Sequence, residues 1–276
     1  MKAIADPQAR AAAKAARRAL ARARLKRSLI AAFTDNPLSL IAAGLFLLLV
    51  ALAIFGPLIA PYDALATDAS AAMAPPSSKH WFGTDPLGRD VLSRVLVSTR
   101  LDMGIALAAV VLSAAVGGLA GACAGYFGGW TDRITGRLAD TIMAFPLFVL
   151  AMGIVAALGN TVANIVLATA IINLPFYQRV ARAESAVLRN AGYIEAARLS
   201  GNGEFKVLFR HIIPNILPPM AVQISLNMGW AILNAAGLSF IGLGARPRRN
   251  GESWSPRARS TSSPANGGSR SSPAWR

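Results

Sequence analysis

The sequence EAARLSGNGEFKVLFRHIIP occupies residues 195–214 and forms a polar interruption between two apolar segments. Residues 179–200 are rich in good helix formers, and their apolar positions recur at steps of three and four, which predicts an amphipathic helix. The Gly-Asn-Gly triplet at 201–203 stops that helix with a tight turn. Glu204 then opens a second short helix. The stretch therefore predicts a helix-turn-helix that lies at a membrane surface.

The same stretch resembles a known sequence motif. Glu195-Ala196-Ala197 is followed by Gly201 six positions after the glutamate, and Pro214 closes the segment. This pattern resembles the EAA loop of ABC-importer permeases, and it is most similar to the dipeptide, oligopeptide and nickel group. In that family the loop is cytoplasmic, and its short helix docks into a groove of the ATP-hydrolysing subunit. A solvated amphipathic linker is the alternative interpretation.

The resemblance implies roles for individual residues of the loop. Gly201 would permit the turn that the docking helix needs, and Glu195 would fix the loop through a cap or an ion pair. The expected ATPase-coupling residues are Glu195, Ala196, Ala197, Gly201, Phe205 and Pro214.

The composition indicates a membrane protein. Hydrophobic residues make up 54% of the 276 residues, charged residues make up 15%, and the mean hydropathy is +0.46. The net charge of +15 is concentrated beside apolar runs, with nine Lys and Arg in residues 1–36 and six in residues 179–210. This is the positive-inside pattern, so we expect a lipid bilayer and no nucleic acid as partner. One cysteine and two distant histidines predict neither a metal site nor a cofactor.

Apolar runs define the predicted topology of an all-α integral membrane protein. Residues 1–36 are expected to be a basic cytoplasmic tail; a targeting peptide is disfavoured because the apolar run begins too late. The five predicted transmembrane helices are residues 37–60, 101–126, 138–158, 162–178 and 215–243. The last four form the permease core at residues 101–244, with the coupling loop at residues 179–214. The intact family has six spans.

Residues 61–100 carry four acids and four bases, which suits an external (periplasmic) loop. Turn-forming residues follow an aromatic pair there, and they predict an ordered loop. The segment HWFGTDPLGRDVLSRVL is similar to a hallmark of the peptide and nickel permeases, and we expect it to have a structural role. Its family-like residues are Gly83, Thr84, Asp85, Gly88, Arg89 and Asp90.

Two features of the predicted core depend on spacing. Gly117, Gly121 and Gly125 recur every four residues, which leaves one helix face bare for the close approach of a neighbouring helix. No Gly-Lys-Ser/Thr follows them, so they are not a phosphate-binding loop. Asp140 lies near the cytoplasmic end of its span, where it can reach the membrane interface or pair with Arg137.

Further expectations concern the connections and the last span. Residues 127–137 are predicted to be a short loop, and Pro146 is predicted to kink the third span. Gln223, Asn227 and Asn234 fall on one helical face, so they face other helices or a pore. A structural hydrogen-bonding role and pore lining both fit these three residues.

The composition changes after Gly244. Residues 246–276 contain seven arginines, one acid and no apolar run. If residues 249–260 are translated one base out of register, permitted codon choices give Glu-Trp-Gly-Val-Met-Val-Ala-Glu-Gly-Ala-Gln. This sequence is similar to the one that follows the corresponding Gly-Leu-Gly segment in the family. We expect residues 245–276 to be a disordered, frameshifted tail. A natural basic tail is the alternative.

The sequence therefore predicts the permease subunit of an ATP-driven importer for peptides, nickel complexes or similar solutes. The resemblance implies two ATP-binding subunits, a second permease and a periplasmic solute-binding protein as partners, and it implies no bond chemistry in this chain. The alternatives are an ATP-independent secondary transporter or channel and an inactive truncated permease. A secondary transporter would show deep intramembrane charges or an internal repeat, and neither is evident.

Overall fold

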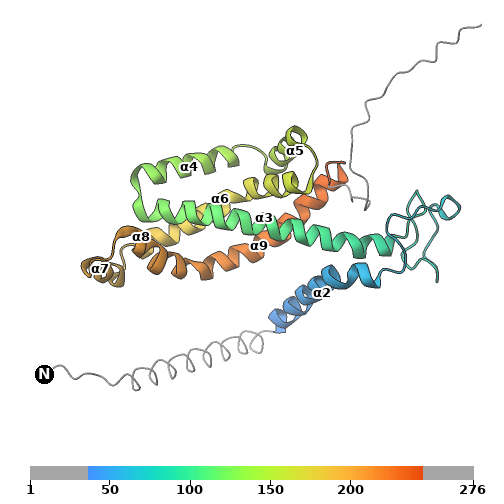
Figure 1. The fold of residues 1–276 in the computed structure, drawn as a ribbon, viewed down its shortest axis with the longest axis horizontal. Coiled ribbons are helices and arrows are strands. Elements are labelled where there is room, and N and C mark those ends of the chain that lie inside the picture. The colour runs from blue at the N-terminus through green and yellow to red at the C-terminus, as the bar shows by residue number, and fades with distance from the viewer. Residues whose placement is uncertain (1–36, 245–276) are drawn as a thin grey trace, which may run out of the picture. The chain divides into compact units, whose positions relative to one another are not determined.

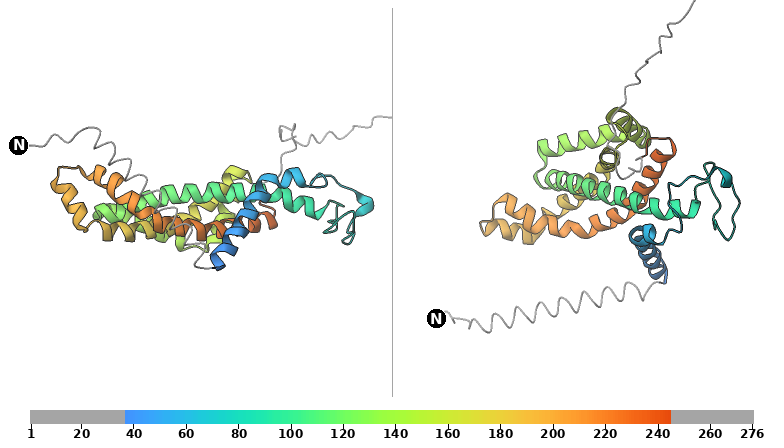
Figure 2. Two further views of the ribbon diagram at one scale, coloured as in Figure 1. Left: turned by 90° about the horizontal axis from the view of Figure 1, so that it is seen from below. Right: turned by 45° about the vertical axis from the view of Figure 1, so that its right-hand side comes forward.

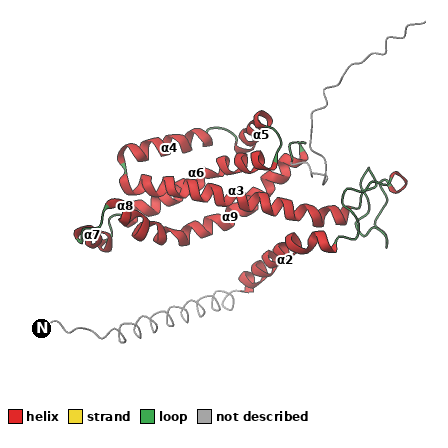
Figure 3. Cartoon of the chain, viewed as in Figure 1, coloured by secondary structure: helices red, strands yellow, loops and turns green. Residues whose placement is uncertain are grey.

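The computed structural model describes residues 37–244, and every named element in that range is helical (Figure 3). The expectations for residues 1–36 and 245–276 lie outside the described residues. The helices in chain order are α2 Pro37–Ile59, the 3-10 turn Ala69–Ala71, α3 Val91–Phe127, α4 Gly129–Met143, α5 Leu147–Leu158, α6 Val162–Leu188, α7 Gly192–Leu199, α8 Glu204–Val207, the π-helical turn Leu208–Ile212 and α9 Ile213–Phe240 (Figure 1).

Helices α3, α6 and α9 form the core, with α2 packed on α3 (Figures 1 and 2). The glycines of α3 explain how closely α6 approaches. A Cβ atom built on Gly117, Gly121 or Gly125 would lie 2.6, 2.2 and 2.2 Å from the backbone oxygens of Leu174, Gln178 and Arg182. Such distances are too short for any side chain, so the predicted close approach of a neighbouring helix is confirmed.

Fewer helices qualify as membrane spans than the five predicted. Among the described residues, α2, α3 and the continuous segment Glu204–Phe240 are long and apolar enough to cross a membrane. The pair α4 and α5 adds a fourth only if its two helices, which meet at 90°, count as one span. Helix α6 is 27 residues long, but it contains two arginines, a glutamate and several uncharged polar residues, and it is not among the helices that qualify.

Several predicted boundaries were wrong because helical structure continues through polar segments. Helix α3 begins at Val91, ten residues earlier than expected, because the side chain of Asp90 caps it. Residues 127–137 are not a loop, since α4 starts at Gly129. The third span is broken rather than kinked: α4 ends at Met143, and α5 begins just after Pro146.

The segment around the coupling loop also differs from the prediction. Helix α6 runs through Pro175 to Leu188, so the predicted helix at residues 179–200 is two helices separated by a turn at residues 189–191. Pro214 does not end the second short helix. It lies in the first turn of α9, directly after the π-helical turn Leu208–Ile212, so the helix continues through it.

Candidate functional site

The coupling loop contains the predicted helix-turn-helix. Helix α7 ends at Leu199, and Gly201 adopts a φ of +79°, which favours glycine and reverses the chain. Asn202 then donates from its backbone N–H and from Nδ2 to the Ala197 carbonyl, at 3.3 and 2.9 Å. These bonds satisfy a carbonyl at the end of α7, so the turn is defined by its own residues.

A polar cluster connects this loop to the end of α3. The Tyr126 hydroxyl donates to a carboxylate oxygen of Glu204, and Arg198 Nε donates to the same hydroxyl at 3.4 Å. Arg198 Nε also lies 3.7 Å from Glu204 Oε2, and its guanidinium lies 5.2 Å from the centre of the Tyr126 ring. These contacts raise the pKa of Arg198, chiefly through the Tyr126 hydrogen bond. The cluster holds α7 and α8 against α3.

Apolar packing separates the loop into a buried side and an exposed side. The residues buried beneath it are Ile194, Val207, Leu208 and Ile212. On the other side, Leu199 is 84% exposed and Phe205 is 71% exposed, and Tyr193 is 46% exposed. The Phe205 ring is fixed partly by Phe127, whose ring centre lies 5.8 Å away. A helical loop that is anchored on one side and apolar on the other has the properties of a docking surface.

The predicted loop residues lie together, but they contribute differently. Glu195 and Ala196 are exposed on α7, beside the partly buried Ala197. Glu195 lies in the first turn of α7 and acts on Arg198 only through a weak electrostatic interaction. The ion pair of the loop with Arg198 is made by Glu204; for Glu195 the sequence predicted either a cap or an ion pair.

Sequence reasoning did not identify Tyr126, Arg198 or Glu204 as functional residues. Tyr126 lies 72 positions from Arg198 and 78 from Glu204, so no local pattern connects them. The one available signal was that Tyr126 directly follows Gly125, at the end of the glycine-rich face of α3. This position predicts that Tyr126 lies near α6, but it does not predict a contact with the loop.

The polar residues of α9 do not form one continuous row. Gln223 Nε2 donates to Asn227 Oδ1 at 3.1 Å, and Asn227 is buried against the neighbouring helices. Asn234, in contrast, donates to the Trp230 carbonyl of its own helix at 2.9 Å.

Two aspartates organise the segment before α3. Asp85 Oδ1 accepts from the backbone N–H groups of Leu87 and Arg89, at 2.9 and 3.0 Å, and Oδ2 accepts from Arg89 Nε at 2.7 Å. Burial raises the pKa of Asp85, but the hydrogen bonds from Arg89 and Leu87 outweigh it and lower the pKa to about 2. Arg94 also pairs with Asp85. The expected ordered loop is confirmed.

Asp90 connects this loop to the start of α3. Its Oδ2 accepts from Ser93 N at 2.8 Å, which caps the helix, and His80 Nδ1 lies 2.9 Å from its Oδ1. Thr84 forms a short antiparallel bridge with Asp90 and accepts from the Ala74 backbone N–H at 2.8 Å. The family-like residues thus contact one another and the helix end. Their geometry is that of a folded cap on α3.

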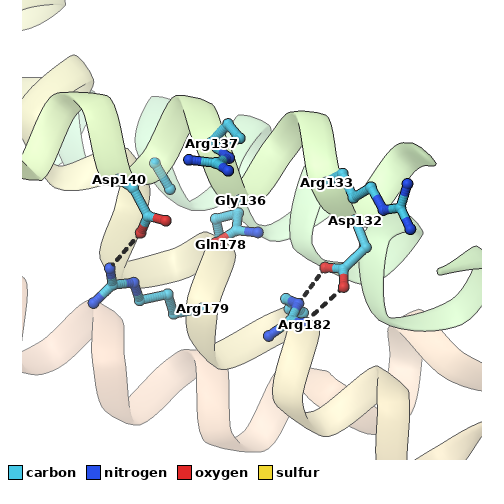
Figure 4. Close-up of a pocket in the computed structure, with 9 residues that line it drawn as sticks. Asp132, Arg133, Gly136, Arg137, Asp140, Gln178, Arg179 and Arg182 are labelled. Carbon is cyan, nitrogen blue, oxygen red and sulfur yellow. Dashed lines mark hydrogen bonds and ion pairs between the residues drawn. The ribbon is translucent and has the colours of Figure 1, made fainter. Parts of the chain in front are cut away.

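Helices α4 and α6 enclose a polar groove of about 420 Å³. Two ion pairs cross it: Arg182 with both carboxylate oxygens of Asp132, and Arg179 Nη2 with Asp140 Oδ1 at 2.8 Å (Figure 4). The partner of Asp140 is therefore Arg179 on α6 and not Arg137, which was one of the two alternatives that the sequence left open for Asp140. Arg137 lines the same groove.

These features define a class of protein. A bundle of apolar helices with candidate membrane spans is an integral membrane protein, and comparison with known families identifies the kind of membrane protein. The family of binding-protein-dependent transport system inner membrane components matches residues 117–253, and the N-terminal transmembrane domain of oligopeptide transport permease C matches residues 24–76. The chain belongs to this family of ABC-importer permeases, and it is a multi-pass inner-membrane protein.

Curated relatives agree with this assignment. A "Glutathione transport system permease protein" of Pectobacterium atrosepticum is 43% identical over 209 residues, which are 75% of this chain and 69% of the relative. A "Probable D,D-dipeptide transport system permease protein" of Escherichia coli is 42% identical over 211 residues, covering 76% of this chain and 71% of the relative. A "Glutathione transport system permease protein" of Shigella dysenteriae is 42% identical over 216 residues, which are 78% of this chain and 71% of the relative. The chain is thus the permease subunit of an ATP-driven importer, a transport component rather than an enzyme.

Proposed function

We propose that residues 192–214 dock onto a separate ATP-hydrolysing subunit and pass its movement to the helix bundle. The observation that carries this proposal is the two-sided loop: Leu199 and Phe205 are exposed, while Tyr126 and Glu204 tie the loop to α3. A force applied to the exposed face would reach α3 directly. Closure of an ATPase dimer would in this way bias the bundle between inward-facing and outward-facing states.

The partners and the orientation follow from this docking. The full assembly would contain two ATP-binding subunits, a second permease and an external solute-binding protein. The coupling loop and the N-terminus would lie on the cytoplasmic side and residues 61–90 outside, which the basic residues between positions 179 and 210 support. The folded cap on α3 would then face the solute-binding protein.

The transported solutes are proposed to be short peptides or peptide-like molecules. The support is the similarity to relatives that are named for glutathione and for D,D-dipeptides. Nickel complexes remain within the range of the family resemblance. Gln223 of α9 is partly exposed, so its amide would offer a hydrogen bond to a peptide group in a pore, while the buried Asn227 would hold it in place.

The docking proposal can be tested by co-purification. Phe205→Ser should reduce recovery of the ATPase subunit with the permease complex at least tenfold, because buried aromatic anchors at interfaces contribute about 2 kcal/mol or more, and 1.4 kcal/mol corresponds to tenfold. Phe82→Ser is the matched control, since Phe82 is 58% exposed in the segment before α3. Equal recovery for the two variants would refute docking through this face.

A further inference from the structure

The groove between α4 and α6 carries more positive charge than its acidic residues neutralise. Four arginines line it, two on each helix, together with two aspartates. Arg179 and Arg182 of α6 are used in the ion pairs with Asp140 and Asp132. The two arginines of α4 have no ion-pair partner among residues 37–244. The groove therefore has a net charge of +2 and two guanidinium groups available to a ligand.

Those two arginines have a defined place on α4. At 100° per residue, Arg133 and Arg137 lie between the aspartates that face α6 and a row of apolar residues. The row is Trp130, Ile134 and Leu138, which are 75%, 55% and 60% exposed. The Arg133 guanidinium also lies 5.8 Å from the centre of the Trp130 ring. Figure 4 shows that Asp132 and Asp140 are directed toward the arginines of α6. Arg133 and Arg137 lie farther from the arginines of α6.

This order of side chains is that of a helix at a membrane interface. An exposed apolar row beside arginines and a tryptophan is typical of amphipathic helices whose apolar side contacts acyl chains while the basic side lies among headgroups. Basic pockets between membrane helices on the cytoplasmic side bind anionic headgroups. The α3–α4 turn lies next to Tyr126 and the coupling loop, so the groove is at the cytoplasmic end under the proposed topology.

We propose that the α4–α6 groove binds the phosphate of an anionic phospholipid. Arg133 and Arg137 would donate to the phosphate oxygens, and Trp130, Ile134 and Leu138 would contact the acyl chains. The volume of about 420 Å³ falls within the range of small-ligand sites. Arg182 stays paired with Asp132, so lipid binding requires no ion pair to break. The single negative charge of the bound phosphate would reduce the net charge of the groove from +2 to +1.

The test measures lipid binding directly and does not depend on transport. The purified permease complex in neutral detergent is titrated with phosphatidylglycerol, and bound lipid is counted by native mass spectrometry. Arg133→Gln with Arg137→Gln should weaken binding about 30-fold, since each basic residue near an anionic lipid surface contributes a factor of about five. Arg100→Gln with Arg189→Gln removes the same charge outside the groove and should leave binding unchanged.

Further arms separate the possible sources of phosphate. Phosphatidylcholine should bind at least tenfold more weakly than phosphatidylglycerol, and millimolar inorganic phosphate should not displace the lipid. Displacement by inorganic phosphate that depends on Arg133 and Arg137 would overturn the assignment to a lipid and give the groove to a free anion. Equal lipid binding by the two double variants would overturn the site altogether. Arg133→Lys with Arg137→Lys should retain most of the affinity, which distinguishes charge from a packing effect.

Discussion

The glycine contact between α3 and α6 leads to a prediction with a control in the same helix. Gly121→Ala places a Cβ atom 2.2 Å from the Gln178 carbonyl oxygen, which is 1.2 Å inside the 3.4 Å at which ordinary contact begins. The two nearest atoms belong to the backbone of α6 and the third is the Cβ atom of Ala181, so no flexible side chain can move away. Gly104→Ala, in contrast, meets no atom within 4 Å. The two substitutions add the same methyl group to helical positions of α3.

The expected energies have opposite signs. Overpacking a close contact costs about 1–3 kcal/mol, and alanine recovers up to about 1 kcal/mol of helix propensity over glycine. Gly121→Ala should therefore destabilise the permease by about 1–2 kcal/mol, while Gly104→Ala should be neutral or stabilising by up to about 1 kcal/mol. For a chain of this size, about 2–4 °C of Tm corresponds to each kcal/mol.

Thermal unfolding of the detergent-solubilised chain, followed by the loss of monodisperse protein in size-exclusion chromatography, measures the difference. We expect the Tm of Gly121→Ala to fall by about 2–8 °C, and that of Gly104→Ala to stay level or rise by a few degrees. If Gly121→Ala were as stable as Gly104→Ala, α6 could not lie against that face of α3, and the packing argument would be refuted.

Two further predictions concern the polar clusters at the two ends of α3. Tyr126→Phe removes the hydroxyl that donates to Glu204. Because such a hydrogen bond contributes about 1 kcal/mol net, amide hydrogen exchange in residues 195–205 should become about fivefold faster. Tyr193→Phe is the control and should leave the exchange rate unchanged. The pKa of Asp85 is lowered to about 2, so its stabilisation of the loop is complete above the unfolded pKa near 4 and is lost as the pH falls through 2. Exchange at the Arg89 amide should show this acid dependence in the wild type, and Asp85→Asn should abolish it.

Predictability from the sequence depended on whether the cause of a feature was local. Gly117, Gly121 and Gly125 predicted close helix packing, because a helix face without side chains lets the backbone of a neighbouring helix approach. The break at Pro146 was foreseen as a kink but not as a 90° turn, since the angle is set by what α5 packs against. The start of α3 at Val91 was not predicted, although Asp90 is a good capping residue. Residues 91–100 mix polar with apolar residues, so they were not predicted to belong to an apolar span. The contact of Tyr126 with Glu204 depends on tertiary packing, which periodicity does not report.

The arrangement of the helices also indicates which parts of the bundle can move. Helix α3 has 37 residues, a length of about 55 Å, so it exceeds the hydrocarbon core and connects the folded cap at Asp90 with the coupling loop at Tyr126. Its backbone lies close to that of α6 at Gly121, Gly117 and Gly125. Close packing over three turns favours movement of α3 and α6 as one body. Helix α5 packs with α6 through Ala151 and Val155, which lie in one buried apolar cluster with Ile165 of α6. Helix α4, in contrast, is joined to α6 by ion pairs with solvent-exposed arginines, and such pairs are weak. A force on the loop would thus displace α3 and α6 relative to α4, and the interface between them is the α4–α6 groove.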